Sequence, residues 1–398
     1  MIEASERVGR LPGYPLAEIP AIKRRLLEAG VDVIDMGAGD ADAMPPAPVV
    51  EALVEAMRDL RYHKYGFQQG LPDFRRACSA FVEQRFHQRF DPFTEILPLI
   101  GSKEGLSHVP LAVCNPGDVV LVPEPGYQAY IGGALLSLSE PHICPLRAER
   151  DFLLDWDAVP ASVLERTGVV YLNYPNNPTA AVAPMEYLEK SVAICRKHGI
   201  LLAYDNAYVD VTFDGYVAPS IFEIPGARDV AIEYLSLSKS YSMTGWRIGY
   251  AVGNPALIGA LTRVKSYVDT GPFLAIQKAG CVALSRSEEF VAPLRAEFQR
   301  RRDAGVAALR AAGLDVESPR AAMYLWVALP PGIKSQPFAR RAMEETGAIV
   351  LPGAAFGPAG EGFFRIALTV PADRLREGIG RLGQVLADIG PEPVAPRA

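Results

Sequence analysis

The sequence of 398 residues predicts an α/β protein: a large domain with a mainly parallel, seven-stranded sheet covered by helices, and a smaller α+β domain. Two observations support this prediction. From about Thr94 to Gly253, short apolar runs alternate with helical stretches, which is typical of parallel strands buried under helices on both faces. Beyond about Ser285, one long charged helical stretch is followed by shorter elements, as expected of a second domain.

Six apolar runs in the central region are expected to form strands. They are EILPLI (95–100), VVLVPE (119–124), GVVYLN (168–173), ILLAYD (200–205), AIEYLS (231–236) and IGYAVG (248–253). The segments 103–114 and 184–199 have helical spacing, and turn residues end each of them. In open α/β sheets, ligands bind beyond the carboxyl ends of the strands, so the polar residues that follow these runs are where chemistry should be sought.

The smaller domain is expected to follow the order helix, strand, helix, strand, helix. Its predicted elements are a helix over about 287–312, a strand at 323–329, a helix at 337–346, a strand at 363–369 and a last helix. The N-terminal segment up to about Met44 is expected to fold beside it. The predicted limits are 1–44 for an N-terminal arm and part of the small domain, 45–285 for the large domain that binds the ligand, and 286–398 for the C-terminal small domain.

Composition argues against several classes of protein. The formal net charge of -6, without a Lys/Arg block, disfavours nucleic acid as a partner. No apolar run approaches the ~20 residues that cross a bilayer, and 1–15 lacks the apolar core of a signal peptide, so a cytoplasmic location is expected. The five histidines show no metal-ligand cluster, and no Gly-x-Gly-x-x-Gly opens a helix after the first strand. The scattered cysteines are expected to be reduced thiols: Cys78, Cys114, Cys144, Cys195 and Cys281.

A lysine follows the strand predicted at 231–236, among small hydroxyl residues. Lys239 could form a Schiff base with an aldehyde cofactor if burial and a neighbouring cation keep its amine partly neutral. The hydroxyls of Ser236 and Ser238, with the guanidinium of Arg247, suit a phosphate dianion because they offer short donors and a bidentate fork. The alternative is a surface loop, which the Gly-Trp-Arg sequence behind the lysine disfavours.

Two further strands end in polar residues. Asp205 ends the run ILLAYD, with Tyr208 three residues later. A buried carboxylate must find a partner or be protonated, and a protonated pyridine nitrogen would satisfy it while keeping the ring able to draw electrons from a substrate carbon. The alternative is a cap on the next helix. Asn177, in the turn YPNNPT, could donate to a phenolate oxygen of such a ring beside Tyr208, although Asn-Asn-Pro is also a plain turn signal.

Two loops complete the predicted sheet edge. IGSKEG (100–105) links a strand to a helix, and its exposed backbone N–H groups could cradle a phosphate, as many helix starts could. Tyr127, which follows the strand at 119–124, could stack on a flat ring; a core aromatic is the alternative.

Arg365 lies inside an apolar strand of the smaller domain. A buried arginine needs an anion, which a substrate carboxylate gripped by two parallel hydrogen bonds would supply. A salt bridge between the domains is the alternative.

Together these residues resemble the fold-type I pyridoxal 5'-phosphate (PLP) aminotransferases, the aspartate aminotransferase superfamily. The likeness covers nearly the whole chain, from GAGD (37–40) to FFRIAL (363–368). The segments 100–130, 171–179 and 236–255 look most like the LL-diaminopimelate aminotransferase group.

By this resemblance, Lys239 is the Schiff-base lysine and the general acid/base of the 1,3-proton shift. Asp205 pairs with the pyridine nitrogen, Asn177 and Tyr208 bond to the phenolic oxygen of PLP, and Tyr127 stacks on its ring.

The resemblance also assigns the phosphate and the substrate. The phosphate is held mostly through hydroxyls, a guanidinium and backbone N–H groups, from Ser102, Lys103, Ser236, Ser238 and Arg247. Tyr65 reaches the phosphate of the other subunit, which implies a homodimer. The substrate α-carboxylate is bound by Arg365, Asn177 and the backbone of Gly39.

The sequence departs from the family pattern at two positions. Ala180 replaces the glycine of the frequent Asn-Pro-Thr-Gly, and its methyl group is tolerable only if the backbone avoids positive φ. Gln68 stands where some diaminopimelate enzymes have a glutamate that contributes to recognition of the distal amino acid end. An amide cannot balance an ammonium as a carboxylate does.

The resemblance implies a ping-pong transfer of an amino group from an L-amino acid, LL-2,6-diaminopimelate among the candidates, to a 2-oxo acid such as 2-oxoglutarate. Alanine, aspartate and aromatic amino acids are alternative donors. The same residues would support the β-elimination of a C–S lyase, racemisation or oxygen-dependent oxidation. A PLP-binding regulator without turnover belongs to another class, which the presence of both Lys239 and Arg365 disfavours.

Overall fold

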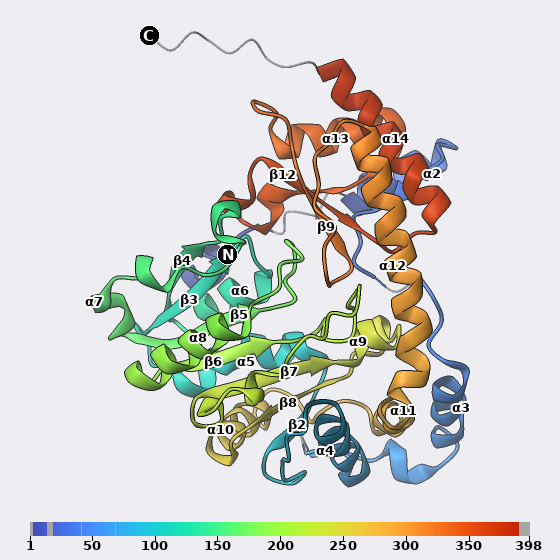
Figure 1. Cartoon of the computed structure of the whole chain (residues 1–398). Coiled ribbons are helices and arrows are strands. Elements are labelled where there is room, and N and C mark those ends of the chain that lie inside the picture. The colour runs from blue at the N-terminus through green and yellow to red at the C-terminus, as the bar shows by residue number, and fades with distance from the viewer. Residues whose placement is uncertain (1–2, 14–18, 41, 68, 390–398) are drawn as a thin grey trace.

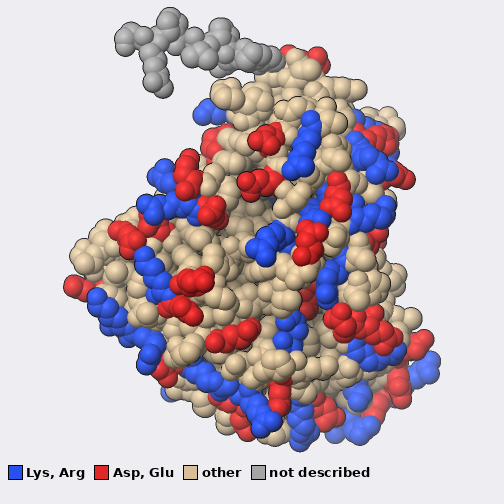
Figure 2. Space-filling model, viewed as in Figure 1, with Lys and Arg blue, Asp and Glu red and all other residues tan. Residues whose placement is uncertain are grey.

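The computed structural model describes residues 3–13, 19–40, 42–67 and 69–389. A larger body is built around one sheet, a smaller body lies against it, and one long helix runs along both (Figure 1). On the face shown in Figure 2, acidic and basic side chains are interspersed. Within the described ranges, no helix combines the length and hydropathy needed to cross a membrane.

The central sheet has seven strands and is mainly parallel, as predicted. Its order is β2-β8-β7-β6-β5-β3-β4, and β8 runs antiparallel to both of its neighbours. The bounds are β2 Ile96–Leu99, β3 Val119–Glu124, β4 Glu140–Pro145, β5 Thr167–Asn173, β6 Leu201–Asp205, β7 Ala231–Ser236 and β8 Gly249–Gly253. Six of these strands match the predicted apolar runs. The sequence pattern missed β4, an edge strand that pairs with β3 alone and carries two prolines, which an edge tolerates.

Helices cover both faces of this sheet because successive strand side chains point to opposite sides. In β3, Leu121 joins one apolar core with α4, α8 and α11, whereas Val120 joins another with α5, α6 and α10. The bounds are α3 Ala47–Ala56, α4 Pro72–Phe86, α5 Ser102–Val113, α6 Gln128–Leu136, α7 Ala161–Leu164, α8 Met185–His198, α9 Leu237–Ser240, α10 Pro255–Lys265 and α11 Leu274–Ser285.

The smaller body has its own apolar core around an antiparallel sheet of order β11-β12-β9. The N-terminal segment joins it through β1, which pairs in parallel with β10. The bounds are α1 Glu6–Gly9, α2 Ile19–Glu28, β1 Ile34–Asp35, α12 Ser287–Ala311, β9 Tyr324–Ala328, α13 Ser335–Thr346, β10 Ala348–Ile349, β11 Leu351–Pro352, β12 Phe363–Ala367 and α14 Ala372–Ile389. The domain limits at 44 and 285 stay predictions.

The cysteines are free thiols, three of them buried. Among the residues that the structure describes, no group of His, Cys, Asp and Glu side chains could hold a metal ion.

Candidate active site

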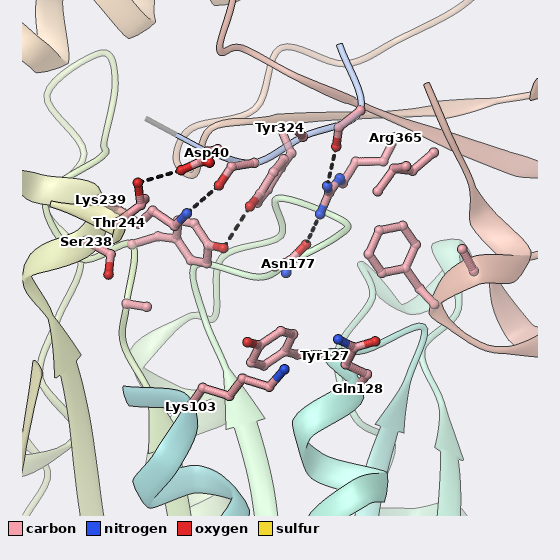
Figure 3. Close-up of a pocket in the computed structure, with 18 of the residues that line it drawn as sticks. Asp40, Lys103, Tyr127, Gln128, Asn177, Ser238, Lys239, Thr244, Tyr324 and Arg365 are labelled. Atoms are coloured by element: carbon pink, nitrogen blue, oxygen red, sulfur yellow. Dashed lines mark hydrogen bonds between the residues drawn. The ribbon is translucent and has the colours of Figure 1, made fainter. Parts of the chain in front are cut away.

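A cavity of about 700 Å³ opens where the carboxyl ends of the parallel strands face the smaller body. Every predicted site residue except Tyr65 lines it. These residues are Gly39, Ser102, Lys103, Tyr127, Asn177, Asp205, Tyr208, Ser236, Ser238, Lys239, Arg247 and Arg365. The cavity therefore gathers side chains that the sequence scatters over more than three hundred positions (Figure 3).

Lys239 is presented to the cavity by α9, a single helical turn that begins directly after β7. The Ser236 hydroxyl caps this turn by accepting from the backbone N–H of Ser238. Behind it, the Ser240 hydroxyl donates to the buried carboxylate of Asp210 at 2.7 Å. Lys239 Nζ donates to the carbonyl oxygen of Gly39 at 2.5 Å, so the amine lies between the two bodies (Figure 3).

Asp205 ends β6 and is 4% exposed. Its Oδ2 accepts from the hydroxyl of Tyr130 at 2.7 Å, and the backbone N–H of Ala207 donates to Oδ1 at 3.4 Å. Burial raises the pKa of Asp205 to about 6, although both hydrogen bonds lower it. The residues that follow form turns rather than a helix, so Asp205 is not a helix cap. A buried carboxyl with so high a pKa suits a cationic partner, such as a pyridinium N–H.

The raised pKa of Asp205 has a measurable consequence for the protein without cofactor. A carboxyl whose folded-state pKa is about 6, against an ordinary 3.8, stabilises the fold fully below pH ~4 and loses that contribution as pH rises through ~6. Asp205→Asn should therefore gain stability relative to wild type across this window, measured by urea unfolding. Bound PLP should remove the difference. A stability difference that does not change with pH would contradict the assignment.

Asn177 and Arg365 meet across the boundary between the two bodies. Arg365, in β12, donates from Nη1 to Asn177 Oδ1 at 2.7 Å and from Nη2 to the carbonyl oxygen of Gly37 at 2.8 Å. Its guanidinium lies over the rings of Tyr324 and Phe356, at 4.1 and 4.8 Å from their centroids. These contacts fix a planar cation at the cavity wall, where it suits a carboxylate ligand.

Tyr208 is paired with Tyr324, a residue that sequence reasoning missed. Their hydroxyls lie 2.8 Å apart, and burial raises the pKa of Tyr208 well above its usual value. A Cβ at Gly39 would lie 2.5 Å from the Tyr324 hydroxyl, so a side chain there would displace the tyrosine. The strand containing Tyr324 was predicted, but nothing in its apolar pattern distinguishes this side chain from a core aromatic.

The loop predicted to cradle a phosphate lies at the start of α5. Gly101 has φ 71°, and a Cβ there would lie 2.5 Å from Arg247 Nη2. The guanidinium therefore rests directly on the loop whose N–H groups open the helix, and its Nη1 donates to the carbonyl oxygen of Thr244 at 2.7 Å. With Ser102 and Ser238 also lining the cavity, this donor set fits a phosphate dianion.

Lys103 and Tyr127 lie on the opposite wall from Arg365 (Figure 3). Lys103 Nζ is 5.7 Å from the centroid of the Tyr127 ring, and both side chains line the cavity. Tyr127 contacts Tyr130 edge to face and packs at the margin of the core while it also lines the cavity. Lys103 lies in the first turn of α5, and its side chain lines the cavity.

The remaining predictions have different outcomes. Gln68 lies outside the described residues. Tyr65 is 71% exposed and lies away from the cavity of its own chain. The expectation that Ala180 avoids positive φ is wrong, because φ is 60°. Hydrogen bonds from Ala180 N to Asn176 O and from Asn176 N to Ala181 O close this turn, which holds Ala180 in a left-handed conformation that costs about 1–2 kcal/mol.

Fold and charge arrangement together define a class of protein: enzymes that hold PLP beyond the carboxyl ends of a mainly parallel sheet. The buried carboxyl of Asp205 suits a ring nitrogen, and the hydroxyl and guanidinium donors around the start of α5 suit a phosphate.

Comparison with known proteins gives the family. The model of the class I and II aminotransferases matches residues 31–382. The LL-diaminopimelate aminotransferase of Aquifex aeolicus is 44% identical over 96% of this chain and 99% of its own length. Substrate-bound BacF from Bacillus subtilis superposes with a TM-score of 0.93 at 32% identity, covering 96% of this chain and 98% of BacF. A probable N-succinyldiaminopimelate aminotransferase from Thermus thermophilus gives a TM-score of 0.88 at 38% identity, covering 92% of this chain and 98% of its own.

The chain belongs to the class I and II aminotransferases. It is a PLP-dependent transaminase that acts on amino acids and 2-oxo acids.

Proposed function

We propose that this enzyme transfers an amino group from LL-2,6-diaminopimelate to a 2-oxo acid, with 2-oxoglutarate as the acceptor, in two half-reactions of a ping-pong cycle. The proposal is supported by the relatives of that name, which are 41–44% identical over nearly their whole length. The observation that carries it within the structure is the amine of Lys103, which lines the cavity on the wall opposite Arg365.

The chain's own residues divide the work of the reaction. When bound, PLP supplies a sink for the electron pair left at the substrate α-carbon. Asp205 would pair with the ring nitrogen and favour its protonated form. Arg365 binds the α-carboxylate and thereby orients the α-carbon toward Lys239. The amine of Lys239 would take the α-proton of the substrate and would then donate a proton as the general acid.

Substrate choice is assigned to the wall that carries Lys103. Diaminopimelate carries a carboxylate and an ammonium at each end, and the amine of Lys103 opposite Arg365 matches the distal carboxylate. Among the described residues, Lys103 has no carboxylate partner, so a substrate anion would meet an unneutralised ammonium.

Lys103→Met should lower kcat/KM for diaminopimelate by about tenfold. This is the size expected for the loss of one partly buried hydrogen bond between charged groups. The value for alanine should change little, because alanine has no distal carboxylate. Steady-state kinetics with both donors checks this expectation. An equal loss with both donors would place Lys103 in cofactor binding alone.

The experiment that tests the proposed reaction is a screen of amino donors against 2-oxoglutarate, with LL-diaminopimelate included. Diaminopimelate should give the highest kcat/KM. Gln68, in place of a glutamate, favours a second candidate, a donor with a neutral side chain. If alanine or an aromatic amino acid is the better donor, the reaction type stands and the substrate is corrected.

The proposed functional unit is a homodimer in which Tyr65 reaches the neighbouring active site. Tyr65 is exposed and contacts Phe67, another exposed aromatic side chain, with ring centroids 5.9 Å apart. Aromatic side chains are enriched in protein interfaces. Mixing a Lys239→Ala subunit with a Tyr65→Phe subunit should restore activity, because one site of the mixed dimer combines both wild-type residues. Mixtures that stay inactive would contradict this arrangement.

A further inference from the structure

A fully buried cation lies outside the cavity, behind the phosphate cradle. Lys265, the last residue of α10, is 0% exposed. Its Nζ donates to Glu104 Oε2 at 2.6 Å and to Asp269 Oδ1 at 2.7 Å. Burying an ammonium is costly unless hydrogen-bonded anions compensate for the lost water. The role of Lys265 therefore depends on which segments its two carboxylate partners connect.

On one side, Lys265 holds the turn that opens α5. Glu104 is the third residue of that helix, and its Oε2 also accepts from the backbone N–H of Ile100 at 3.0 Å. Its Oε1 contacts His108 Nδ1 at 3.2 Å. Burial would raise the pKa of Glu104, but the bonds from His108, Lys265 and Ile100 keep it below its usual value. One carboxylate therefore spans the turn that offers the N–H groups of the phosphate cradle.

On the other side, Lys265 holds the segment that joins α10 to α11. Asp269 Oδ1 also accepts from the backbone N–H of Gly271 at 2.6 Å. The carbonyl oxygen of Pro272 accepts from Gln277, whose Oε1 accepts from the backbone N–H of Leu71. Residues 269–273 are thus linked to the chain that follows Tyr65. The second carboxylate oxygen of Asp269 is buried without a hydrogen-bond donor among the described residues, which leaves Lys265 as the cation that fixes it.

We propose that Lys265 is a positioning residue that couples the phosphate-binding turn 100–104 to the segment 269–273. Phosphate bound at the turn fixes the backbone around Glu104, and the Glu104–Lys265–Asp269 chain carries that constraint to the segment. Neither Glu104, Lys265 nor Asp269 lines the cavity, so their effect on the cofactor is indirect. The inference rests on the proposed phosphate site but not on the identity of the amino donor.

The first test measures PLP affinity by titrating the cofactor-free protein and following absorbance. Glu104→Gln keeps an acceptor for Ile100 N–H but loses the charge, and Asp269→Asn does the same at the far end. Each should raise the dissociation constant of PLP about tenfold, within the usual range of coupling between sites. The double variant should be little worse than either single variant, because both break one chain.

Asn254→Ala is the matched control. Asn254 caps the other end of α10 by accepting from the N–H groups of Ala256 and Leu257. Its replacement should lower the melting temperature without changing the PLP dissociation constant. If Asp269→Asn also lowers only the melting temperature, Lys265 contributes to stability without affecting PLP affinity, and the proposal is overturned.

The second test measures the rate of amide hydrogen exchange in the segment 269–273. Adding PLP should slow exchange of 269–273 in wild type more than adding pyridoxal, which lacks the phosphate. Glu104→Gln should remove that difference. Equal protection by PLP and pyridoxal in wild type would overturn the coupling while leaving the cofactor site intact. A wild-type protein that binds no PLP would overturn the cofactor site as well, and neither test depends on diaminopimelate turnover.

Discussion

Replacing Lys239 with arginine should abolish transamination. A guanidinium stays protonated at neutral pH, so it can neither form an imine with PLP nor remove the α-proton of a substrate. The loss of general acid/base catalysis alone is worth about 10²–10⁴ in rate, and loss of the covalent attachment adds to it. The measurement is kcat with diaminopimelate and 2-oxoglutarate, together with the visible absorbance of the bound cofactor.

The control for this variant is its fold. Arginine keeps a positive charge that can reach the carbonyl oxygen of Gly39, so the melting temperature should stay close to that of wild type. The variant should still bind PLP through the phosphate cradle and Asp205, without the imine. Turnover at the wild-type rate would refute the role of Lys239 and, with it, the mechanism.

Replacing Arg365 with lysine should lower kcat/KM for every α-amino acid and every 2-oxo acid by about 10²–10³. This is the size expected when one member of a buried, hydrogen-bonded charge pair loses its geometry. A lysine cannot bond Asn177 and the carbonyl oxygen of Gly37 together as the fork of Arg365 does, nor offer a carboxylate two parallel donors. Steady-state kinetics with alanine, diaminopimelate and 2-oxoglutarate measures the effect.

Arg302→Lys provides the matched control. Arg302 is another buried arginine, on α12, which pairs with Asp214 away from the cavity. It should cost stability and leave kcat/KM nearly unchanged. PLP affinity should be close to wild type in both variants, because neither arginine belongs to the phosphate cradle. A loss with Arg365→Lys confined to diaminopimelate would move the residue from α-carboxylate binding to selection of the distal end.

The sheet was predictable because its interior strands are apolar on both faces. Helices cover both sides, so β3, β5 and β6 are nearly continuous apolar runs, and β7 is interrupted only by the buried Glu233. The edge strand β4 was not predictable, since its residues are less buried and Pro141 and Pro145 resemble loop signals. The two-residue strands β1, β10 and β11 are too short for any pattern, and pairing between distant segments creates them.

The site was predictable where a polar residue interrupts an apolar run. Asp205 at the end of β6 and Arg365 inside β12 stand out because burial of an ionic group needs a partner. Tyr130 and Tyr324 gave no such signal. Each occupies an apolar stretch, and its hydroxyl becomes informative once the fold places it against Asp205 or Tyr208.

The sequence by itself determined where apolar runs end in polar residues. It therefore predicted the edge of the sheet at which Lys239, Asp205 and Asn177 gather. The tertiary structure decided which groups bond to one another: Arg365 to Asn177, Tyr324 to Tyr208, and Lys265 to both Glu104 and Asp269. The physical reason is that the burial of a segment depends on its own hydrophobicity, which can be read from the local sequence. A hydrogen bond between distant segments depends instead on where packing brings the two backbones together.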